Sequence, residues 1–331
     1  MSQTHVKRPS APSKAQNAKS VDQHVLKSKT KGINRAAIAR ESAEQRILDI
    51  FSEAFKSYLN DPEFDTKLKS IKAHFFNREY LEIFTDPTLL NVYSASYAPH
   101  RALLFYDLFK KQPELITSLL DNGEVFCLGA GTGAELVGII AALLPSLPTS
   151  PLIEPTTNNT QPALIHIQDM ADYSQPISEL KKAIKLTWPV VEPCIDIQFS
   201  VNDVAVANPA IDEYITKYVS RSNIITTFFI LNELLQADKP GFVRLVGRIV
   251  RAMRPLSIWV IIDSAGSFSS HAVGGTTGEK REYMAYQFLD MLDGLEIVAK
   301  EESCWYRLPA GLSYPLPLQN SRYYYRVFRR I

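Results

Sequence analysis

One glycine-rich segment of this sequence is suited to holding a ligand, namely Gly129-Ala130-Gly131-Thr132-Gly133. An apolar run at 125–128 precedes it and a longer one at 134–144 follows, which predicts a strand, a turn and a helix in succession. Glycines in such a turn let a ligand approach the backbone, and the N-terminus of the next helix offers N–H groups. The pattern is typical of a site for a nucleotide-containing cofactor, either a nicotinamide dinucleotide or S-adenosylmethionine.

The position of the next acidic residue helps to choose between these cofactors. A dinucleotide site needs an acid about 20 residues after the turn, at the end of the second strand. Here that region is a stretch rich in Pro, Thr, Ser and Asn that contains Glu154, and the acid that closes a strand-like run is Asp169. This late position favours S-adenosylmethionine, with Asp169 accepting the ribose hydroxyl protons and Met170 beside it at the same site. Asp172 is the alternative if the strand ends later.

Polar residues also follow the third, fourth and fifth predicted strands. Asn202 and Asp203 could meet the adenine amino group, or they could form a turn before the next helix. Asn232 and Glu233 could lie beside the sulfonium and the methyl acceptor, or they could cap a helix. Asp263 could face the acceptor or cap a loop. Because ligands bind at the carboxyl ends of parallel strands, we expect these side chains at the same edge as the glycine turn.

A segment upstream of the turn, 93–101, combines tyrosines with His100 and Arg101. The guanidinium of Arg101 could pair with the methionine carboxylate of the cofactor, and Tyr97 could flank the transferred methyl group or a base. A structural salt bridge and ordinary core tyrosines are the alternative. A proton acceptor for the reaction could be Glu233, Asp263 or His100.

The elements that would hold these residues alternate between strand and helix. Strands are predicted at 125–128, 164–167, 195–201, 224–231 and 258–262, with helices at 134–144, 177–186, 210–219 and 241–253. A further helix is predicted at 283–292, and further strands at 295–300, 303–308 and 323–329. This alternation predicts an α/β fold with a mostly parallel, seven-stranded sheet and helices on both faces.

Three regions are expected along the chain. Residues 1–32 are polar and basic and predict a disordered tail, and 33–121 predict a helical region broken at Asp86-Pro87 and at Tyr97-Ala98-Pro99. Residues 122–331 form the predicted Rossmann-like domain, in which 145–162 is a surface insertion.

Charge is distributed unevenly. The first 40 residues hold nine Lys and Arg against the single acid Asp22, whereas the rest of the chain is mildly acidic. No acid occurs from residue 303 onward, where arginines alternate with aromatic residues: Tyr306, Arg307, Tyr314, Arg322, Tyr323, Tyr324, Tyr325, Arg326, Phe328, Arg329 and Arg330. Such residues suit RNA through phosphate contacts and base stacking, and the alternative is an aromatic sheet strand with a basic end.

Other classes of site find little support in the sequence. The three cysteines are far apart and have no metal-like spacing to the six histidines, so we expect neither a disulfide framework nor a bound metal. The longest apolar stretch, 136–144, is too short to span a membrane. We expect a monomer that does not associate with membranes.

Taken together, these segments resemble the fungal 25S (large-subunit) rRNA uridine-N3 methyltransferases, which have a long helical region before a Rossmann-like core. The matching stretches are 97–102, 125–133, 231–234, 262–264, 314–316 and 320–323. One departure is Cys127, which stands where many methyltransferases carry an acid, and it shifts the holding of the methionine amino group to backbone carbonyls or to another acid such as Asp263.

The resemblance implies a class I fold, S-adenosyl-L-methionine as cofactor and methyl transfer to N3 of a uridine in large-subunit rRNA. It also implies rRNA or a pre-ribosomal particle as partner, and a location in the nucleus or nucleolus, with the cytoplasm as a second place. Three alternatives stay open. They are a non-catalytic ribosome-assembly factor that keeps the fold, an NAD(P)-dependent oxidoreductase, and a methyltransferase that acts on a protein or a small molecule.

Overall fold

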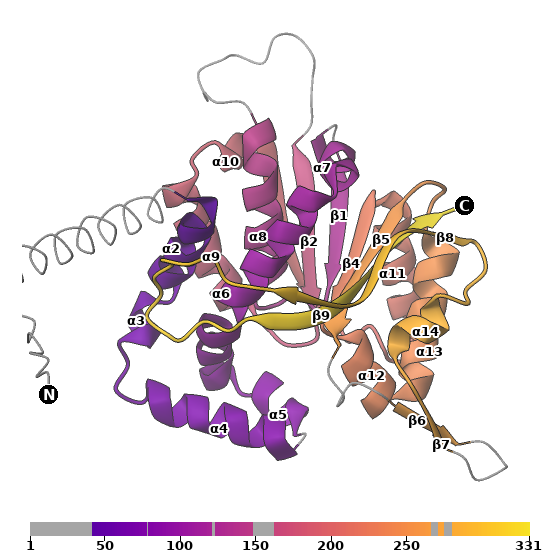
Figure 1. Cartoon of the computed structure of the whole chain (residues 1–331), viewed down its shortest axis with the longest axis horizontal. Helices are drawn as coiled ribbons and strands as arrows, with labels where there is room; N and C mark the ends of the chain where they lie inside the picture. Colours follow the sequence, from indigo (N-terminus) through magenta and orange to yellow (C-terminus); the bar gives the residue numbers. More distant parts are fainter. Residues whose placement is uncertain (1–41, 78, 121–122, 148–161, 266–270, 275–279) are drawn as a thin grey trace, which may run out of the picture.

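The computed structural model describes residues 42–331 except 78, 121–122, 148–161, 266–270 and 275–279. The predicted basic tail, most of the predicted insertion at 145–162, and Glu154 therefore lie outside the described residues. The described part contains one large sheet flanked by helices and a small hairpin formed by β6 (His271–Gly274) and β7 (Lys280–Tyr283) (Figure 1).

The large sheet has seven strands in the order β3-β2-β1-β4-β5-β9-β8. Strands β1 to β5 are parallel to one another, and β9 runs antiparallel to both β5 and β8. The bounds are β1 Glu124–Leu128, β2 Ala163–Asp169, β3 Ile195–Val201, β4 Ile224–Phe228, β5 Ile258–Ser264, β8 Leu295–Tyr306 and β9 Ser321–Arg330. The predicted mostly parallel, seven-stranded α/β sheet is confirmed.

Two strand predictions were wrong in detail. The fourth strand ends at Phe228 rather than at residue 231, because Phe229 adopts a left-handed backbone (φ 57°) and turns the chain into the next helix. The two strands predicted at 295–300 and 303–308 are one strand, β8, whose pairing with β9 shifts register between Ile297 and Ala299 and between Glu301 and Cys304. These irregularities interrupt the alternation of apolar and polar residues that the prediction relied on.

Helices cover both faces of the sheet. Before β1 they are α2 Ala43–Ala54, α3 Lys56–Leu59, α4 Phe64–Asn77, α5 Tyr80–Phe84, α6 Pro87–Lys111 and α7 Pro113–Leu120. After β1 they are α8 Ala134–Leu143, the 3₁₀ turn η1 Leu144–Ser146, α9 Ser174–Thr187, α10 Val191–Cys194, α11 Pro209–Arg221, α12 Leu231–Ala237, α13 Lys239–Ala252 and α14 Ala285–Leu289. The predicted alternation of strands with helices is therefore confirmed.

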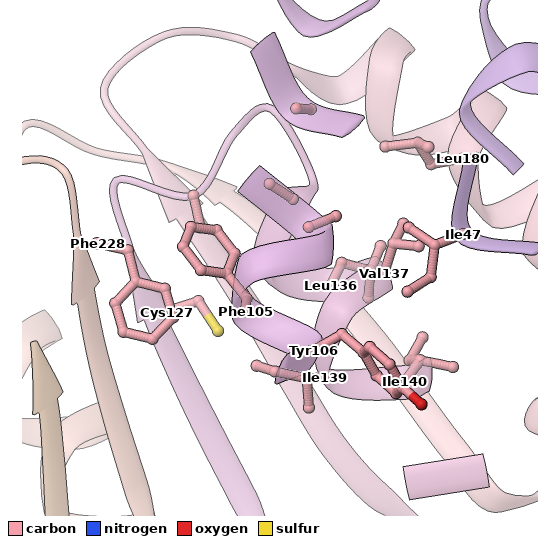
Figure 2. Packing of buried hydrophobic residues seen from close by; sticks show 14 of the residues in the cluster. Ile47, Phe105, Tyr106, Cys127, Leu136, Val137, Ile139, Ile140, Leu180 and Phe228 are labelled. Carbon is pink, nitrogen blue, oxygen red and sulfur yellow. The ribbon is translucent and has the colours of Figure 1, made fainter. Parts of the chain in front are cut away.

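Alternate residues of each strand supply two separate cores. Val125 and Cys127 of β1 join the core packed against α2, α6, α8 and α9, whereas Phe126 and Leu128 join the core against α11 and α13. Figure 2 shows the first core, in which Phe105 from α6 and residues of α8 pack over Cys127 and Phe228 of the sheet. The helical region thus shares a continuous core with the sheet.

Helix α6 runs through Pro99, so the predicted break at Tyr97-Ala98-Pro99 was wrong, whereas the break at Asp86-Pro87 is confirmed. Proline has no N–H, and inside a helix it leaves the carbonyl four residues earlier without its partner. That carbonyl belongs to Ala95, and it accepts a hydrogen bond of 2.7 Å from the Tyr314 hydroxyl instead. A side chain from far along the sequence therefore replaces the missing bond and lets the helix continue.

The segment before β9 fastens the helical region to the sheet. Gln45 of α2 donates to the Ser313 carbonyl and accepts from the Ser313 N–H, both at 2.9 Å, and the adjacent Tyr314 reaches Ala95. In Figure 1 this yellow segment crosses the indigo and violet helices before it enters the sheet. We call residues 313–314 the strap.

Candidate functional site

A cavity of about 610 Å³ lies at the carboxyl edge of the sheet. Its walls include Gly129 and Thr132 from the turn after β1, and Phe229 and Glu233 from the segment after β4. Strands β1 and β4 are neighbours in the sheet. After β1 the chain continues to β2 and β3 on one side, and after β4 it continues to β5 on the other side. Ligands bind at such a switch point in open α/β sheets, and the volume is that of a small-molecule site.

The glycine turn is held in shape by its own surroundings. Gly129 and Gly133 have positive φ angles of 70° and 75°, which favour glycine. A Cβ on Gly131 would lie 2.0 Å from the Tyr173 ring, so only glycine fits there. The Gly131 N–H donates to Asp169 at 2.8 Å, which ties the turn to the end of β2. Of the turn residues, Gly129 and Thr132 line the cavity, whereas Ala130, Gly131 and Gly133 support its shape.

The residues predicted to bind the ribose and the adenine of the cofactor line this cavity. Asp169 is the last residue of β2, and it lines the cavity together with Met170 and Asp203. Burial raises the pKa of Asp169 to about 6. Hydrogen bonds from the backbone N–H groups of Ala171 and Gly131 lower this pKa, but the effect of burial is larger. Asp172 instead caps the turn at Ser174, so β2 ends where the first of the two alternatives placed it.

Arg101 enters the cavity from α6 inside a group of aromatic rings. Its guanidinium lies 4.9 Å from the centre of the Phe229 ring and donates to the Tyr93 hydroxyl at 3.0 Å. Tyr97 packs on the same group, with its ring centre 5.9 Å from the guanidinium. Within the part of the chain that the structure describes, no carboxylate forms an ion pair with Arg101, so the cation can bind an anionic group of a ligand.

Phe229 combines two features that mark functional sites. Its left-handed backbone is uncommon for a residue other than glycine and costs about 1–3 kcal/mol. Its ring lines the cavity and stacks near Arg101. The strained turn therefore places the ring against the cation, and it sends the chain from β4 toward Glu233.

Two glutamates, from the segments after β1 and β4, also line the cavity, and the sequence pointed to only one of them. Burial raises the pKa of Glu233 to about 7, with the nearby Asp263 carboxylate adding to the rise. Burial raises the pKa of Glu135 to about 8. The prediction omitted Glu135, although an acid directly after the glycine turn in an otherwise apolar helix was a usable signal.

Three of the residues predicted as catalytic do not line the cavity. The Asn232 side chain donates to the Ser264 carbonyl and accepts from the Tyr324 hydroxyl. Both Asp263 oxygens accept backbone N–H groups, from Asn232 at 2.9 Å and from Ser264 at 2.7 Å. Asp263 thus caps the start of α12, whereas its structural alternative was a cap of the loop after β5, and Tyr97 packs beside Arg101.

The remaining proton-acceptor candidate, His100, is also outside the cavity lining. It is buried in α6, where burial and the Arg101 cation lower its pKa to about 3. Glu233 is therefore the one among the three candidates for this role that faces the cavity.

The arginines and aromatics of the C-terminal strand are mainly structural. Arg326 is fully buried and binds both oxygens of Asp290, at 2.7 and 3.0 Å. Arg329 pairs with Glu114 and Glu296, and Tyr324 and Phe328 are buried in the second core. The predicted RNA contact by Arg326 was therefore wrong, because its charge is taken up inside the protein. Alternate residues of β9 face opposite sides of the sheet, since Tyr323 and Val327 belong to the first core.

No group of three or more His, Cys, Asp and Glu side chains among the described residues is arranged to hold a metal ion, and all three cysteines are free. None of the described helices combines the length and apolar character required to cross a bilayer.

Comparison with solved structures finds methyltransferases with low similarity. A SAM-dependent methyltransferase from Methanosarcina mazei aligns with a TM-score of 0.40 and 12% identity, over 66% of this chain and 97% of that one. The N-methyltransferase NodS of Bradyrhizobium japonicum WM9, in complex with S-adenosyl-L-homocysteine, aligns with a TM-score of 0.36 and 12% identity, over 67% of this chain and 87% of that one.

Sequence comparison gives stronger matches. The 25S rRNA (uridine(2843)-N(3))-methyltransferase of Saccharomyces cerevisiae is 25% identical over 316 residues, which cover 86% of this chain and 85% of the yeast protein. The sequence model of a family described as "Putative SAM-dependent methyltransferase" matches residues 51–329. That match includes the helical region, the glycine turn and β9, so the chain belongs to this family of S-adenosylmethionine-dependent methyltransferases.

Proposed function

We propose that this chain transfers a methyl group from S-adenosylmethionine to N3 of a uridine in large-subunit rRNA. The observation that carries the proposal is the extent of the similarity to the yeast enzyme, which covers 86% of this chain and not only the generic glycine turn. The residues of the cavity are consistent with this chemistry. No observation in the cavity favours the oxidoreductase or the non-catalytic alternative.

The cavity offers groups that fit each part of the cofactor. In this proposal Asp169 accepts the ribose hydroxyl protons, and Met170 and Asp203 border the adenine; all three residues line the cavity. Arg101, whose guanidinium donates to the Tyr93 hydroxyl, is the partner for the methionine carboxylate. When bound, S-adenosylmethionine supplies a methyl group on a positively charged sulfur. The protein's contribution is to align the acceptor and to exclude water.

We assign the removal of the acceptor proton to Glu233. N3 of uracil carries a proton in the neutral base, and that proton has to leave when the new bond forms. The Glu233 carboxyl lines the cavity, and its raised pKa of about 7 suits a group that accepts a proton near neutral pH. Because N3 is engaged in base pairing, the uridine would have to be unpaired or turned out of a helix to reach this carboxylate.

Nucleoside mass spectrometry tests the proposed function. Large-subunit rRNA from a strain that lacks the enzyme is incubated with the purified protein and S-adenosylmethionine, digested and analysed for 3-methyluridine. We expect one equivalent of 3-methyluridine per rRNA, and none with heat-inactivated protein. Absence of 3-methyluridine with both rRNA and pre-ribosomal particles as substrates would contradict the proposal.

A thermal-shift experiment separates the two cofactor classes. S-adenosylhomocysteine should raise the melting temperature, whereas NAD and NADP should leave it unchanged, because a ligand stabilises a protein only when it binds the folded state. The further parts of the proposal are a monomer that works on rRNA or a pre-ribosomal particle in the nucleus or nucleolus. They are tested by the sedimentation and localisation of the tagged protein.

A further inference from the structure

Glu135 is a buried acid for which the described residues provide no complete set of partners. It lies in the first turn of α8, whose other residues are apolar or glycine, and its side chain lines the cavity. The residue is 3% exposed, and its Oε1 atom has no hydrogen-bond partner among the described residues. Burying a carboxylate without a partner costs roughly several kcal/mol. We therefore expect a bound ligand to supply the missing partner of Glu135.

The opposite charge that acts on Glu135 belongs to Arg101 on the neighbouring helix. Electrostatic attraction by Arg101 lowers the pKa of Glu135, although burial outweighs it. The two side chains form no ion pair with each other in the described structure, although both line the cavity. The cavity wall therefore presents a cation and an anion that are both available to a ligand.

Close packing of α6 on α8 sets this arrangement. One turn after Glu135, Gly138 faces α6, where an added Cβ would lie 2.8 Å from the Ala102 carbonyl oxygen and 3.0 Å from the Phe105 Cβ. Glycine thus lets the backbones of the two helices approach next to Arg101. A free α-amino acid group carries an ammonium and a carboxylate on one carbon atom, so it matches a wall with one carboxylate and one guanidinium.

We propose that Glu135 binds the α-ammonium group of the cofactor's methionine part, while Arg101 binds its carboxylate. This assignment explains how the ammonium group is bound although Cys127 of β1 stands where many methyltransferases carry an acid. Burial raises the pKa of the Cys127 thiol well above its usual value, so the thiol is neutral and cannot balance an ammonium group. The carboxylate comes instead from the first turn of the helix that follows the glycine turn.

The proposal is tested by removing the α-amino group of the ligand and the carboxylate of Glu135 separately. S-adenosylhomocysteine and its analogue in which hydrogen replaces the α-amino group are each titrated into the wild-type protein and into Glu135→Gln by calorimetry. We expect the wild type to prefer S-adenosylhomocysteine by about ten- to hundredfold, the range for a hydrogen bond between charged groups. Glu135→Gln should bind both ligands with nearly equal affinity.

A matched control uses Glu233, another carboxyl group of the same cavity. Glu233→Gln should keep the wild-type preference for the amino group, because Glu233 is assigned to the acceptor side. Equal binding of the two ligands by the wild type would overturn the proposal, as would an unchanged preference in Glu135→Gln. Circular dichroism and melting temperature identify a variant that fails to fold, and the wild-type comparison of the two ligands then decides the question.

Discussion

Glu233 is the residue at which binding and chemistry can be separated by one substitution. Replacing it with glutamine keeps the shape but removes the proton acceptor, so we expect turnover to fall by about 10²- to 10⁴-fold. The affinity for S-adenosylhomocysteine should change by less than about threefold, because Arg101 and Asp169 are untouched. The measurement is the single-turnover rate of methyl transfer together with calorimetric binding.

The pH profile of the same pair of proteins provides the control. The wild-type rate should rise with pH through about 7, the raised pKa of Glu233, because only the deprotonated carboxyl can accept a proton. The residual rate of Glu233→Gln should lack this rise. A variant with the wild-type rate and profile would remove Glu233 from the chemistry.

The individual site residues differ in how far the sequence could define them. Asp169, Asp203 and Glu233 follow strands, and the rule that ligands bind at carboxyl edges was enough to place them at the cavity. Asn232 and Asp263 follow the same rule, but their side chains turn toward backbone groups, which the sequence does not encode in any short pattern. Glu135 lies in a helix and does not follow a strand directly, so this rule did not point to it.

At the scale of elements, Pro99 and Tyr314 make a prediction about helix α6. Tyr314→Phe leaves the Ala95 carbonyl without a donor and should lower the free energy of unfolding by about 1–3 kcal/mol. In a Pro99→Ala background the same substitution should cost less, because the new N–H at position 99 can donate to Ala95. Urea unfolding of the four proteins measures this coupling. Equal costs in the two backgrounds would show that Tyr314 does not compensate for the proline.

The contact between α6 and α8 gives a second prediction at this scale. Gly138→Ala adds a methyl group 2.8 Å from the Ala102 carbonyl oxygen, so the helices must move apart. We expect a loss of about 1–3 kcal/mol in the free energy of unfolding, together with weaker binding of S-adenosylhomocysteine because Arg101 moves with α6.

Gly247→Ala in α13 is the matched control for this substitution. The nearest atom to its added methyl group is the flexible end of Arg251, at 3.1 Å. Alanine there should stabilise the protein by up to about 1 kcal/mol through its higher helix propensity. If Gly138→Ala also stabilised the protein, the close approach of α6 and α8 would not depend on the glycine.

For the whole molecule, the acidic residues of the cavity link stability to pH. Burial raises the pKa of Asp169 to about 6, of Glu233 to about 7 and of Glu135 to about 8. The folded protein therefore holds more protons than the unfolded chain between the ordinary and the raised values. This contribution to stability is complete below the ordinary values of 3.8 and 4.5 and is lost as pH rises to about 8.

The expected result is a lower melting temperature for the ligand-free protein at pH 8 than at pH 6. S-adenosylhomocysteine should add more stability at pH 8, because its ammonium group binds the deprotonated carboxylate. Calorimetric scans at both pH values, with and without the ligand, measure the effect, and Glu135→Gln should reduce the difference. A ligand-free protein that is more stable at pH 8 would contradict this linkage.

The fold as a whole was more predictable than the side-chain interactions that hold distant segments together. Apolar runs and helical patterns defined the strands and helices of the sheet, because burial on both faces leaves a continuous apolar signal in β1 and β5. The continuity of α6 through Pro99 depended on Tyr314, and the burial of Arg326 depended on Asp290. Such contacts join residues that are far apart in the sequence, so local sequence patterns do not predict them.

The strap also has a consequence for the order of events during folding. Its hydrogen bonds join Gln45 to Ser313 across 268 positions and Ala95 to Tyr314 across 219. Contacts between such distant residues carry a large entropic cost before they form, and chains that depend on them fold slowly. We therefore expect α6 to dock in a late step of refolding, so that the ability to bind S-adenosylhomocysteine returns after most of the helical circular-dichroism signal has recovered.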